Sequence, residues 1–233
     1  MRVPWRLLRR FVLYAIVVGV VAPWLLVLPL AIVDPPTTMV MTIRTVQRAA
    51  QLKGPPRRVA APRSAVSPHL RRAVLAAEDD RFFLHYGLDF IEIENALERR
   101  RRGRRLRGAS TVTQQTAKNL FLWEGRSYLR KGMELYIALV LETCLTKDRI
   151  LDLYVNLAEW GDGVFGAEMA ARTHFRKSAA RLTRDEAARL AAVLPAPRRW
   201  NPNGTLARRR AYVILQRMSY AAPREVEAPR RRR

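Results

Sequence analysis

The chain has 233 residues, with 43 lysines and arginines against 20 aspartates and glutamates, which gives a formal net charge of +23. This length allows one sizeable domain and a tether, and a hydrophobic fraction of 49% is ample for a packed core. The charge predicts an anionic partner, either nucleic acid, an acidic membrane surface or a phosphate-bearing ligand, while the single cysteine, Cys144, excludes an intramolecular disulfide.

An uncharged apolar stretch covers residues 11–33, which read FVLYAIVVGVVAPWLLVLPLAIV. A helix needs roughly 20 apolar residues to cross a bilayer, so the stretch predicts a single transmembrane anchor. No small-residue cleavage site of the A-x-A type follows, which favours an uncleaved anchor over a cleaved signal peptide. Arginines cluster in residues 1–10, and the positive-inside rule keeps such a segment in the cytoplasm. We therefore expect a single-pass inner-membrane protein with its main domain in the periplasm.

The remainder of the chain divides into three segments. Residues 34–68 are rich in proline, arginine and alanine and predict an extended juxtamembrane linker. From residue 69 to 222 apolar residues recur every three or four positions without sustained strand alternation, which predicts a mainly α domain. Residues 223–233 end in APRRRR and predict a basic, disordered tail.

The first candidate site is the segment 78–87, which reads EDDRFFLHYG. Glu78 ends an apolar helical pattern and is followed at once by aromatic residues. A carboxylate beside aromatic side chains is partly desolvated, which raises its pKa toward the range useful for a general base. The alternative is that these acids are solvated residues at a helix end, as charged side chains usually are.

A polar series follows in RLRGASTVTQQTAKNLFLWEGRS, residues 105–127. Its hydroxyl and amide side chains suit sugar hydroxyls, amides and phosphate oxygens. The alternative is a capped helix start, with Ser110 or Thr111 as the cap and Gln114 closing a capping box. Both interpretations can hold together.

A third cluster lies in SYLRKGMELYIALVLE, where Arg130, Lys131 and Glu134 share one face of a predicted helix. Basic residues at this spacing can hold a pyrophosphate, and the glutamate can orient them or ligate a divalent cation that bridges phosphate oxygens. The alternative is a surface ion pair that contributes only a few tenths of a kcal/mol.

Four segments in this order resemble the successive motifs of the peptidoglycan glycosyltransferase family, glycosyltransferase family 51: EDDRFFLHYG, GASTVTQQTAKNLFL, RKGME and KDRILDLYVNLAEWGDGVFGAEMAA. The resemblance covers roughly residues 69–203. It implies a mainly α, lysozyme-like glycosyltransferase domain behind a single N-terminal transmembrane helix. It also implies an inverting enzyme that polymerises lipid II into linear β-1,4 glycan strands and releases undecaprenyl pyrophosphate in cell-wall biosynthesis.

The resemblance also implies roles for single residues. Glu78 matches the base that deprotonates the acceptor's GlcNAc 4-hydroxyl. Glu134 matches a second catalytic glutamate near the donor pyrophosphate, where a divalent metal, Mg or Mn, is expected and no organic cofactor. Phe82 would keep the site dry, and Asp79 and His85 would hold the loop by hydrogen bonds. His85 would support the structure rather than transfer a proton. The implied substrate-binding residues are Asp79, Phe82, His85, Ser110, Thr111, Gln114, Gln115, Lys118, Arg126, Arg130 and Lys131.

The partners implied are lipid II, the growing lipid-linked glycan, inner-membrane lipids and other cell-wall synthesis proteins, but no nucleic acid. Two rival functions share some of these features. A lysozyme-like muramidase or lytic transglycosylase would not need the cations around Glu134. A membrane-tethered nucleic-acid-binding protein would explain the charge, but the predicted anchor places the basic domain outside the cytoplasm, and aromatic residues are not interleaved as in single-strand binders. The arginine run at 98–107 predicts either contact with anionic lipid or pyrophosphate, or a solvated disordered segment.

Overall fold

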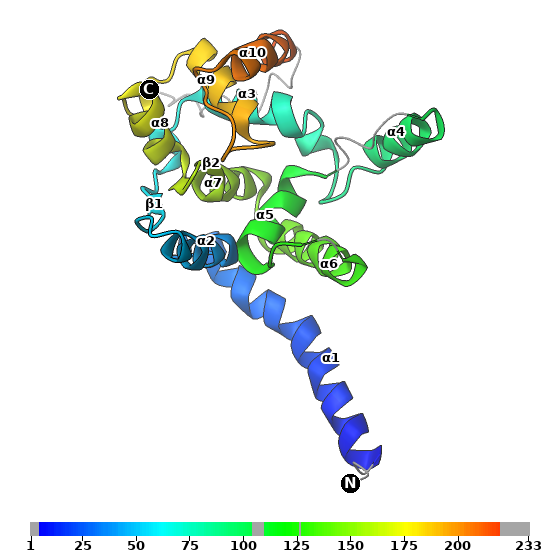
Figure 1. The fold of residues 1–233 in the computed structure, drawn as a ribbon. Coiled ribbons are helices and arrows are strands. Elements are labelled where there is room, and N and C mark those ends of the chain that lie inside the picture. The colour runs from blue at the N-terminus through cyan, green and yellow to red at the C-terminus, as the bar shows by residue number, and fades with distance from the viewer. Residues whose placement is uncertain (1–4, 104–109, 126, 220–233) are drawn as a thin grey trace, which may run out of the picture.

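The computed structural model describes residues 5–103, 110–125 and 127–219, and the expectation of a mainly α protein is confirmed (Figure 1). The α-helices are α1 Trp5–Val27, α2 Met39–Ala50, α3 Pro68–Glu78, α4 Phe90–Arg101, α5 Val112–Phe121, α6 Tyr128–Cys144, α7 Lys147–Leu157, α8 Ala167–Phe175, α9 Arg184–Val193 and α10 Thr205–Arg217. Short 3-10 helices occur at Leu28–Ala31, Arg63–Ala65, Phe82–Leu84 and Ala179–Arg181. The predicted tail at 223–233 lies outside the described residues.

A small three-stranded sheet accompanies the helices, in the order β1-β3-β2. Strand β1 (Arg57–Arg58) runs parallel to β3 (Val164–Phe165), and β2 (Glu159–Gly161) runs antiparallel to β3. Strands of two or three residues are too short to produce a visible alternation of apolar and polar side chains, so the sequence did not predict them.

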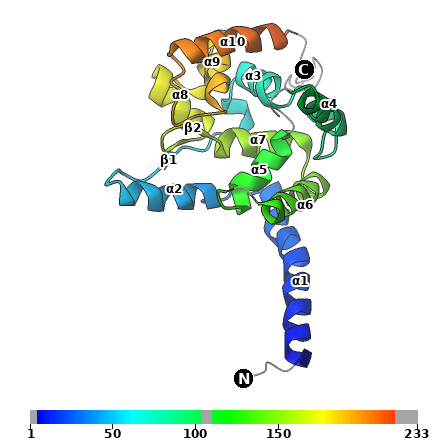
Figure 2. The same cartoon turned by 45° about the vertical axis from the view of Figure 1, so that its right-hand side comes forward.

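Helix α1 leaves the body of the molecule, and its N-terminal end lies far from the other helices (Figures 1 and 2). The side-chain N–H of Trp24 donates to the hydroxyl of Tyr136 at 2.9 Å, and that hydroxyl donates to the carbonyl of Val20 at 2.7 Å. These bonds fasten the end of α1 to α6. Across the part of the chain that the structure describes, no helix combines the length and apolarity needed to span a bilayer. The predicted anchor at 11–33 is therefore not confirmed.

The segment 34–68 differs from the extended linker that its composition predicts, because it contains α2 and β1. The Thr38 side chain caps α2 by accepting from the Met41 N–H at 3.2 Å. Buried Arg44 then pairs with Glu124 at 2.6 Å and with Glu159 at 3.0 Å. The helix was missed because its buried face carries an arginine, which makes the apolar pattern look incomplete.

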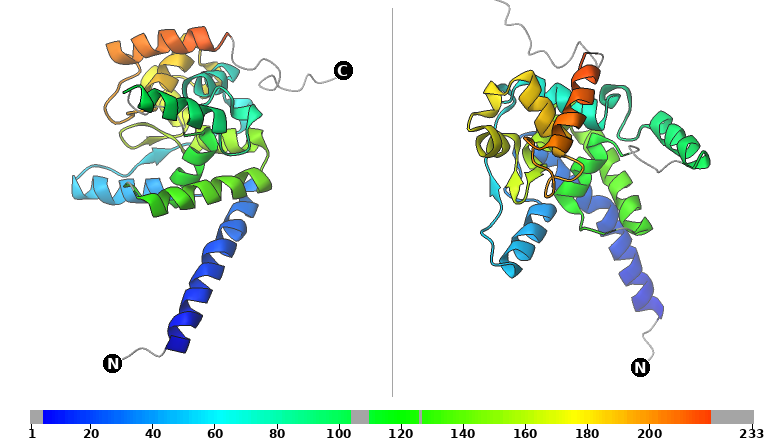
Figure 3. Two further views of the ribbon diagram at one scale, coloured as in Figure 1. Left: turned by 90° about the vertical axis from the view of Figure 1, so that its right-hand side faces the viewer. Right: turned by 45° about the horizontal axis from the view of Figure 1, so that its top comes forward.

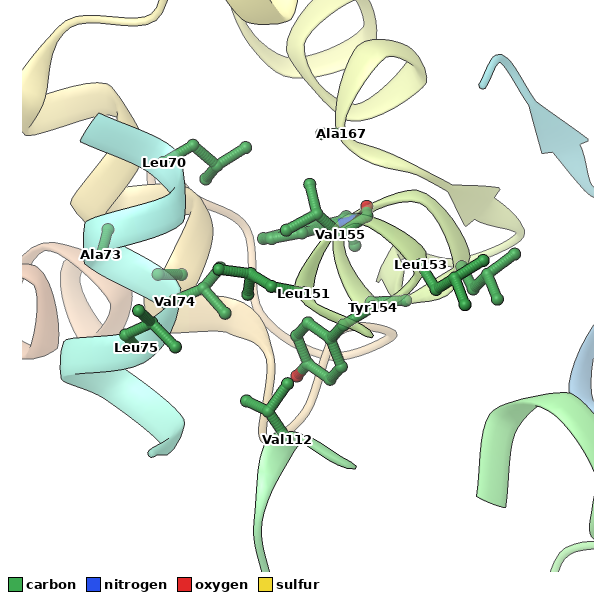
Figure 4. Packing of buried hydrophobic residues seen from close by; sticks show 14 of the residues in the cluster. Leu70, Ala73, Val74, Leu75, Val112, Leu151, Leu153, Tyr154, Val155 and Ala167 are labelled. Carbon is green, nitrogen blue, oxygen red and sulfur yellow. Dashed lines mark hydrogen bonds between the residues drawn. The ribbon is translucent and has the colours of Figure 1, made fainter. Parts of the chain in front are cut away.

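The core lies between α3, α5 and α7, where side chains such as Leu70, Val74, Leu151 and Tyr154 are buried against one another (Figure 4). Helix α9 packs against both α3 and α10 through alanines with no exposed surface. Helix α10 therefore covers the end of the body opposite α1 (Figure 3). This packing fixes the C-terminal end of α3, where Glu78 lies, beneath α10.

Candidate active site

Glu78 is the last residue of α3, and its side chain is largely buried, with 14% of its surface exposed. Its Oε2 accepts a hydrogen bond from the Gln115 amide at 3.0 Å. The Gln115 Oε1 in turn accepts from the hydroxyl of buried Tyr154 at 3.1 Å. A chain of neutral groups from α7 through α5 therefore fixes one oxygen of the carboxylate.

Burial raises the pKa of Glu78, and the opposing effects of the Gln115 hydrogen bond and of the Arg210 and Lys118 charges do not cancel this rise. A carboxyl group with a raised pKa is a stronger base than an exposed glutamate, yet it is ionised at neutral pH unless the shift is very large. The environment of Glu78 thus matches the requirement for a general base.

The segment after Glu78 is held by Asp79. Its carboxylate contacts the Nε2 of His85 at 3.0 Å and accepts from the backbone N–H of Val112 at 2.9 Å. Val112 begins α5, so a negative charge is placed at a helix N-terminus, where it is stabilising. Both bonds support the prediction that Asp79 and His85 hold this loop.

Phe82 is also part of this support. It is 1% exposed and packs in the core, with the Nζ of Lys147 at 4.4 Å from its ring centroid. Phe82 is absent from the lining of the cleft beside Glu78, so its packing places it under the loop. Its predicted role in keeping the site dry stays a prediction.

A cleft of about 820 Å³ opens beside Glu78. Its acidic side comes from the end of α3 and the start of α4, and its other side comes from α10 and the segment before it. The lining includes Glu78, Asp79, Ser110, Gln115, Trp200 and Arg210.

The polar series of the second motif divides between support and cleft. Thr111 and Gln114 form the capping box at the start of α5, and the Thr111 hydroxyl also donates to the Gly87 carbonyl at 2.6 Å. Exposed Ser110 and half-buried Gln115 line the cleft, as does Thr111. The capping interpretation is confirmed, and contact of this segment with sugar hydroxyls or phosphate oxygens stays a prediction.

The third motif forms a charge cluster around Glu134 on α6, which is only 4% exposed. Arg130 Nη1 lies 3.0 Å from its Oε2, and Lys131 contacts its other oxygen as well as Gln114 Oε1, the latter at 3.3 Å. The burial of Glu134 argues against a simple surface ion pair. Burial also lowers the pKa of Lys118, while the charge of Glu134 opposes that change.

The predicted metal at Glu134 would need oxygen ligands from the side chains around it. Among the residues that the structure describes, no group of three or more histidine, cysteine, aspartate or glutamate side chains could hold a metal ion. The neighbours of Glu134 are cations rather than oxygen ligands, so these residues do not fit a metal held by the protein alone. A Mg²⁺ or Mn²⁺ ion stays a prediction. The predicted phosphate contact Arg126 lies outside the described residues.

Sequence reasoning missed Arg210, which lines the cleft from α10 and reaches to 3.5 Å from Glu78 Oε1. Arg210 belongs to the run ARRRAY, whose other arginines are exposed. Its separation from Glu78 by 132 positions leaves no local signal. Only its place on the buried side of a helix that covers α3 could have indicated it.

Comparison with known proteins places this site in a family. Residues 45–219 match the family described as Transglycosylase. The chain belongs to the transglycosylase family. It is 50% identical to the biosynthetic peptidoglycan transglycosylase of Rhodospirillum centenum, over 92% of this chain and 91% of that protein.

Other relatives of the same name agree with this membership. The chain is 43% identical to the protein of Xanthomonas campestris pv. campestris, over 94% of this chain and 92% of the relative. It is 46% identical to the protein of Pseudomonas putida, over 85% of this chain and 86% of that relative. The family match begins within α2, so it includes part of the segment that composition predicted to be a linker.

Proposed function

We propose that the chain joins lipid II units into linear β-1,4 glycan strands, with Glu78 as the base and the cluster around Glu134 at the donor pyrophosphate. Membership of the transglycosylase family makes the chain a peptidoglycan glycosyltransferase of cell-wall synthesis. The observation that carries the assignment of roles is the environment of Glu78, a largely buried carboxylate with a raised pKa beside an open cleft.

On the acceptor side, Glu78 removes the proton of a GlcNAc 4-hydroxyl as its oxygen attacks the anomeric carbon of the donor MurNAc. The new C–O bond forms on the face opposite the leaving group, which inverts the anomeric configuration. This geometry parallels inverting glycoside hydrolysis, in which a base activates the incoming hydroxyl and a sugar hydroxyl here replaces water. The Gln115 hydrogen bond keeps the carboxylate oriented during the attack.

On the donor side, the bond between the anomeric carbon and the pyrophosphate oxygen breaks, and the pyrophosphate leaves with the electron pair. Lys118, Arg130 and Lys131 supply positive charge where this negative charge develops, and Glu134 holds the last two in place. Preorganised cations stabilise such charge without reorganisation, which lessens the need for a general acid.

The same proposal includes an inner-membrane anchor in α1, with the catalytic domain in the periplasm. Its support is the uncharged stretch 11–33 and the large apolar side chains that α1 exposes, among them Phe11, Leu13, Val18 and Leu25. A lipid-linked donor also requires the domain to work at a lipid surface. Resistance of the full chain to carbonate extraction from membranes would support the anchor, and release into the supernatant would contradict it.

The activity is tested with detergent-solubilised full chain and labelled lipid II. We expect a ladder of lengthening glycans, because each cycle adds one disaccharide unit. The lysozyme-like rival predicts instead that pre-made glycan is shortened, and a protein that does neither would contradict the proposal. The cations at Glu134 disfavour the rival, since cleavage of a neutral glycosidic bond does not need them.

A further inference from the structure

The two oxygens of Glu78 have different partners. Oε2 is fixed at 3.0 Å by the Gln115 amide, which is itself bonded to Tyr154. Among the described residues, the contact of Oε1 is the Nη2 of Arg210 at 3.5 Å, a distance beyond a strong hydrogen bond. Oε1 therefore keeps lone pairs for an incoming hydroxyl, whereas Oε2 is already engaged.

Arg210 is placed beside Glu78 by the packing of its helix and by a contact with the main chain. Helix α10 packs against α9 and α3, and the same Nη2 lies 3.5 Å from the carbonyl of Ala77, the residue before Glu78. The side chain is 36% exposed and lines the cleft. One guanidinium thus reaches the main chain of α3, the carboxylate and the substrate space.

The geometry points to Arg210 as a positioning residue for the base: it keeps Glu78 ionised and leaves Oε1 as the oxygen that accepts the acceptor's proton. This inference rests on the proposed function of Glu78. A full-strength salt bridge at 2.8 Å would occupy Oε1 and compete with the acceptor hydroxyl. A guanidinium at 3.5 Å gives electrostatic support without taking that place.

The balance of charge around Glu78 supports this role. Burial favours the neutral acid, while Arg210 is a cation that opposes it and thereby lowers the pKa of Glu78. A protonated Glu78 cannot take a proton, so loss of Arg210 must remove active enzyme at low pH. The ionisable groups that bear on Glu78 from the surrounding elements are Asp79 after α3, Lys118 on α5, Tyr154 on α7 and Arg210 on α10.

The experiment compares pH–rate profiles of lipid II polymerisation for the full chain with Arg210→Gln, Arg210→Lys and Arg209→Gln. The acidic limb of such a profile is the range in which the rate falls as the pH is lowered. For Arg210→Gln we expect this limb to move up by about one pH unit, so that the rate at a given pH on the limb is about tenfold lower. Arg210→Lys keeps the charge and should restore most of the shift. Arg209 is an exposed neighbour on α10, so Arg209→Gln removes an equal charge and should leave the limb in place.

Thermal unfolding of each variant separates an effect on Glu78 from a loss of folded protein. A limb that does not move in Arg210→Gln would overturn the inference, as would a lower rate at all pH values with a lower melting temperature and no rescue by lysine. Glu78→Gln is measured in parallel. If it is inactive while the Arg210→Gln limb stays fixed, only the inference fails. If Glu78→Gln polymerises normally, the proposed base itself is wrong.

Discussion

Glu78 and Glu134 carry the same side chain and both act electrostatically on Lys118, but they have different neighbours. A neutral amide holds Glu78 at 3.0 Å, and its nearest cation lies 3.5 Å away. Glu134 is contacted directly by Arg130 and Lys131. Burial is similar in kind at the two sites, so the partners decide what each carboxylate can do.

This difference separates a base from an organiser of charge. A carboxylate whose two oxygens each contact a cation has no free oxygen directed at a sugar hydroxyl. A carboxylate held by an amide keeps both its orientation and its basicity. The contrast supports the proposed roles, which are proton transfer for Glu78 and pyrophosphate stabilisation for the cations that Glu134 holds.

The largest effect is expected for Glu78→Gln. Glutamine has nearly the same shape and can still meet Gln115, but it cannot accept the hydroxyl proton. We expect the initial rate on lipid II to fall by about 10²–10⁴-fold, with the melting temperature nearly unchanged. Glu98→Gln is the matched control, because Glu98 is exposed on α4 and its ion-pair partner in the described part of the chain is Arg102. A near-normal rate for Glu78→Gln would remove the basis of the comparison.

Glu134→Gln should have the next largest effect, by a different route. Arg130 and Lys131 lose the carboxylate that fixes them, so the donor pyrophosphate is misplaced, which can cost about 10²-fold in rate. The acidic limb of the pH profile should stay where it is, because Glu78 is untouched. Donor titrations and the response of the rate to Mg²⁺ check this; an unchanged rate would reduce the cluster to an ordinary ion pair.

Much of this site could be predicted from the sequence, because its motifs are continuous. Glu78 and Gln115 lie in two segments whose residue types suit the chemistry, and the structure joins them by one hydrogen bond. The capping role of Thr111 was also predictable, since a capping box spans only four residues.

Other features depend on contacts between distant segments and left no such pattern. Arg210 reaches Glu78 across 132 positions, and nothing in ARRRAY distinguishes it from its exposed neighbours. The sequence did not indicate helix α2, because prolines lie on either side of it and Arg44 interrupts its apolar face. The charge of Arg44 is neutralised by residues far along the chain. Contacts with residues far along the chain therefore decide whether a basic residue lies on the surface or belongs to the site.

A moderate effect is expected from pH in the unmodified chain. Glu78 must be ionised to act, so activity falls as pH drops through its pKa, which burial places above the ordinary glutamate value of about 4.3. Lys118 must be protonated to stabilise pyrophosphate, and burial lowers its pKa, so the alkaline limb should lie below the ordinary lysine value of about 10.4. A bell-shaped profile of initial rates against pH checks both signs. An acidic limb at or below the ordinary glutamate value would contradict the assignment of Glu78.

The smallest effect on the rate is expected for His85→Ala, although His85 lies near the base. Its Nε2 contacts the Asp79 carboxylate, and its side chain is 5% exposed, so the histidine supports the loop and does not reach the cleft lining. Its loss leaves a buried carboxylate short of one partner, which costs about 1–3 kcal/mol in the free energy of unfolding. Denaturant unfolding should show that loss, while the acidic limb should remain at the pH of the parent chain. A moved limb with unchanged stability would instead make His85 a partner of Glu78 in proton transfer. The base would then be a pair of residues, and the comparison with Glu134 would no longer be between two single carboxylates.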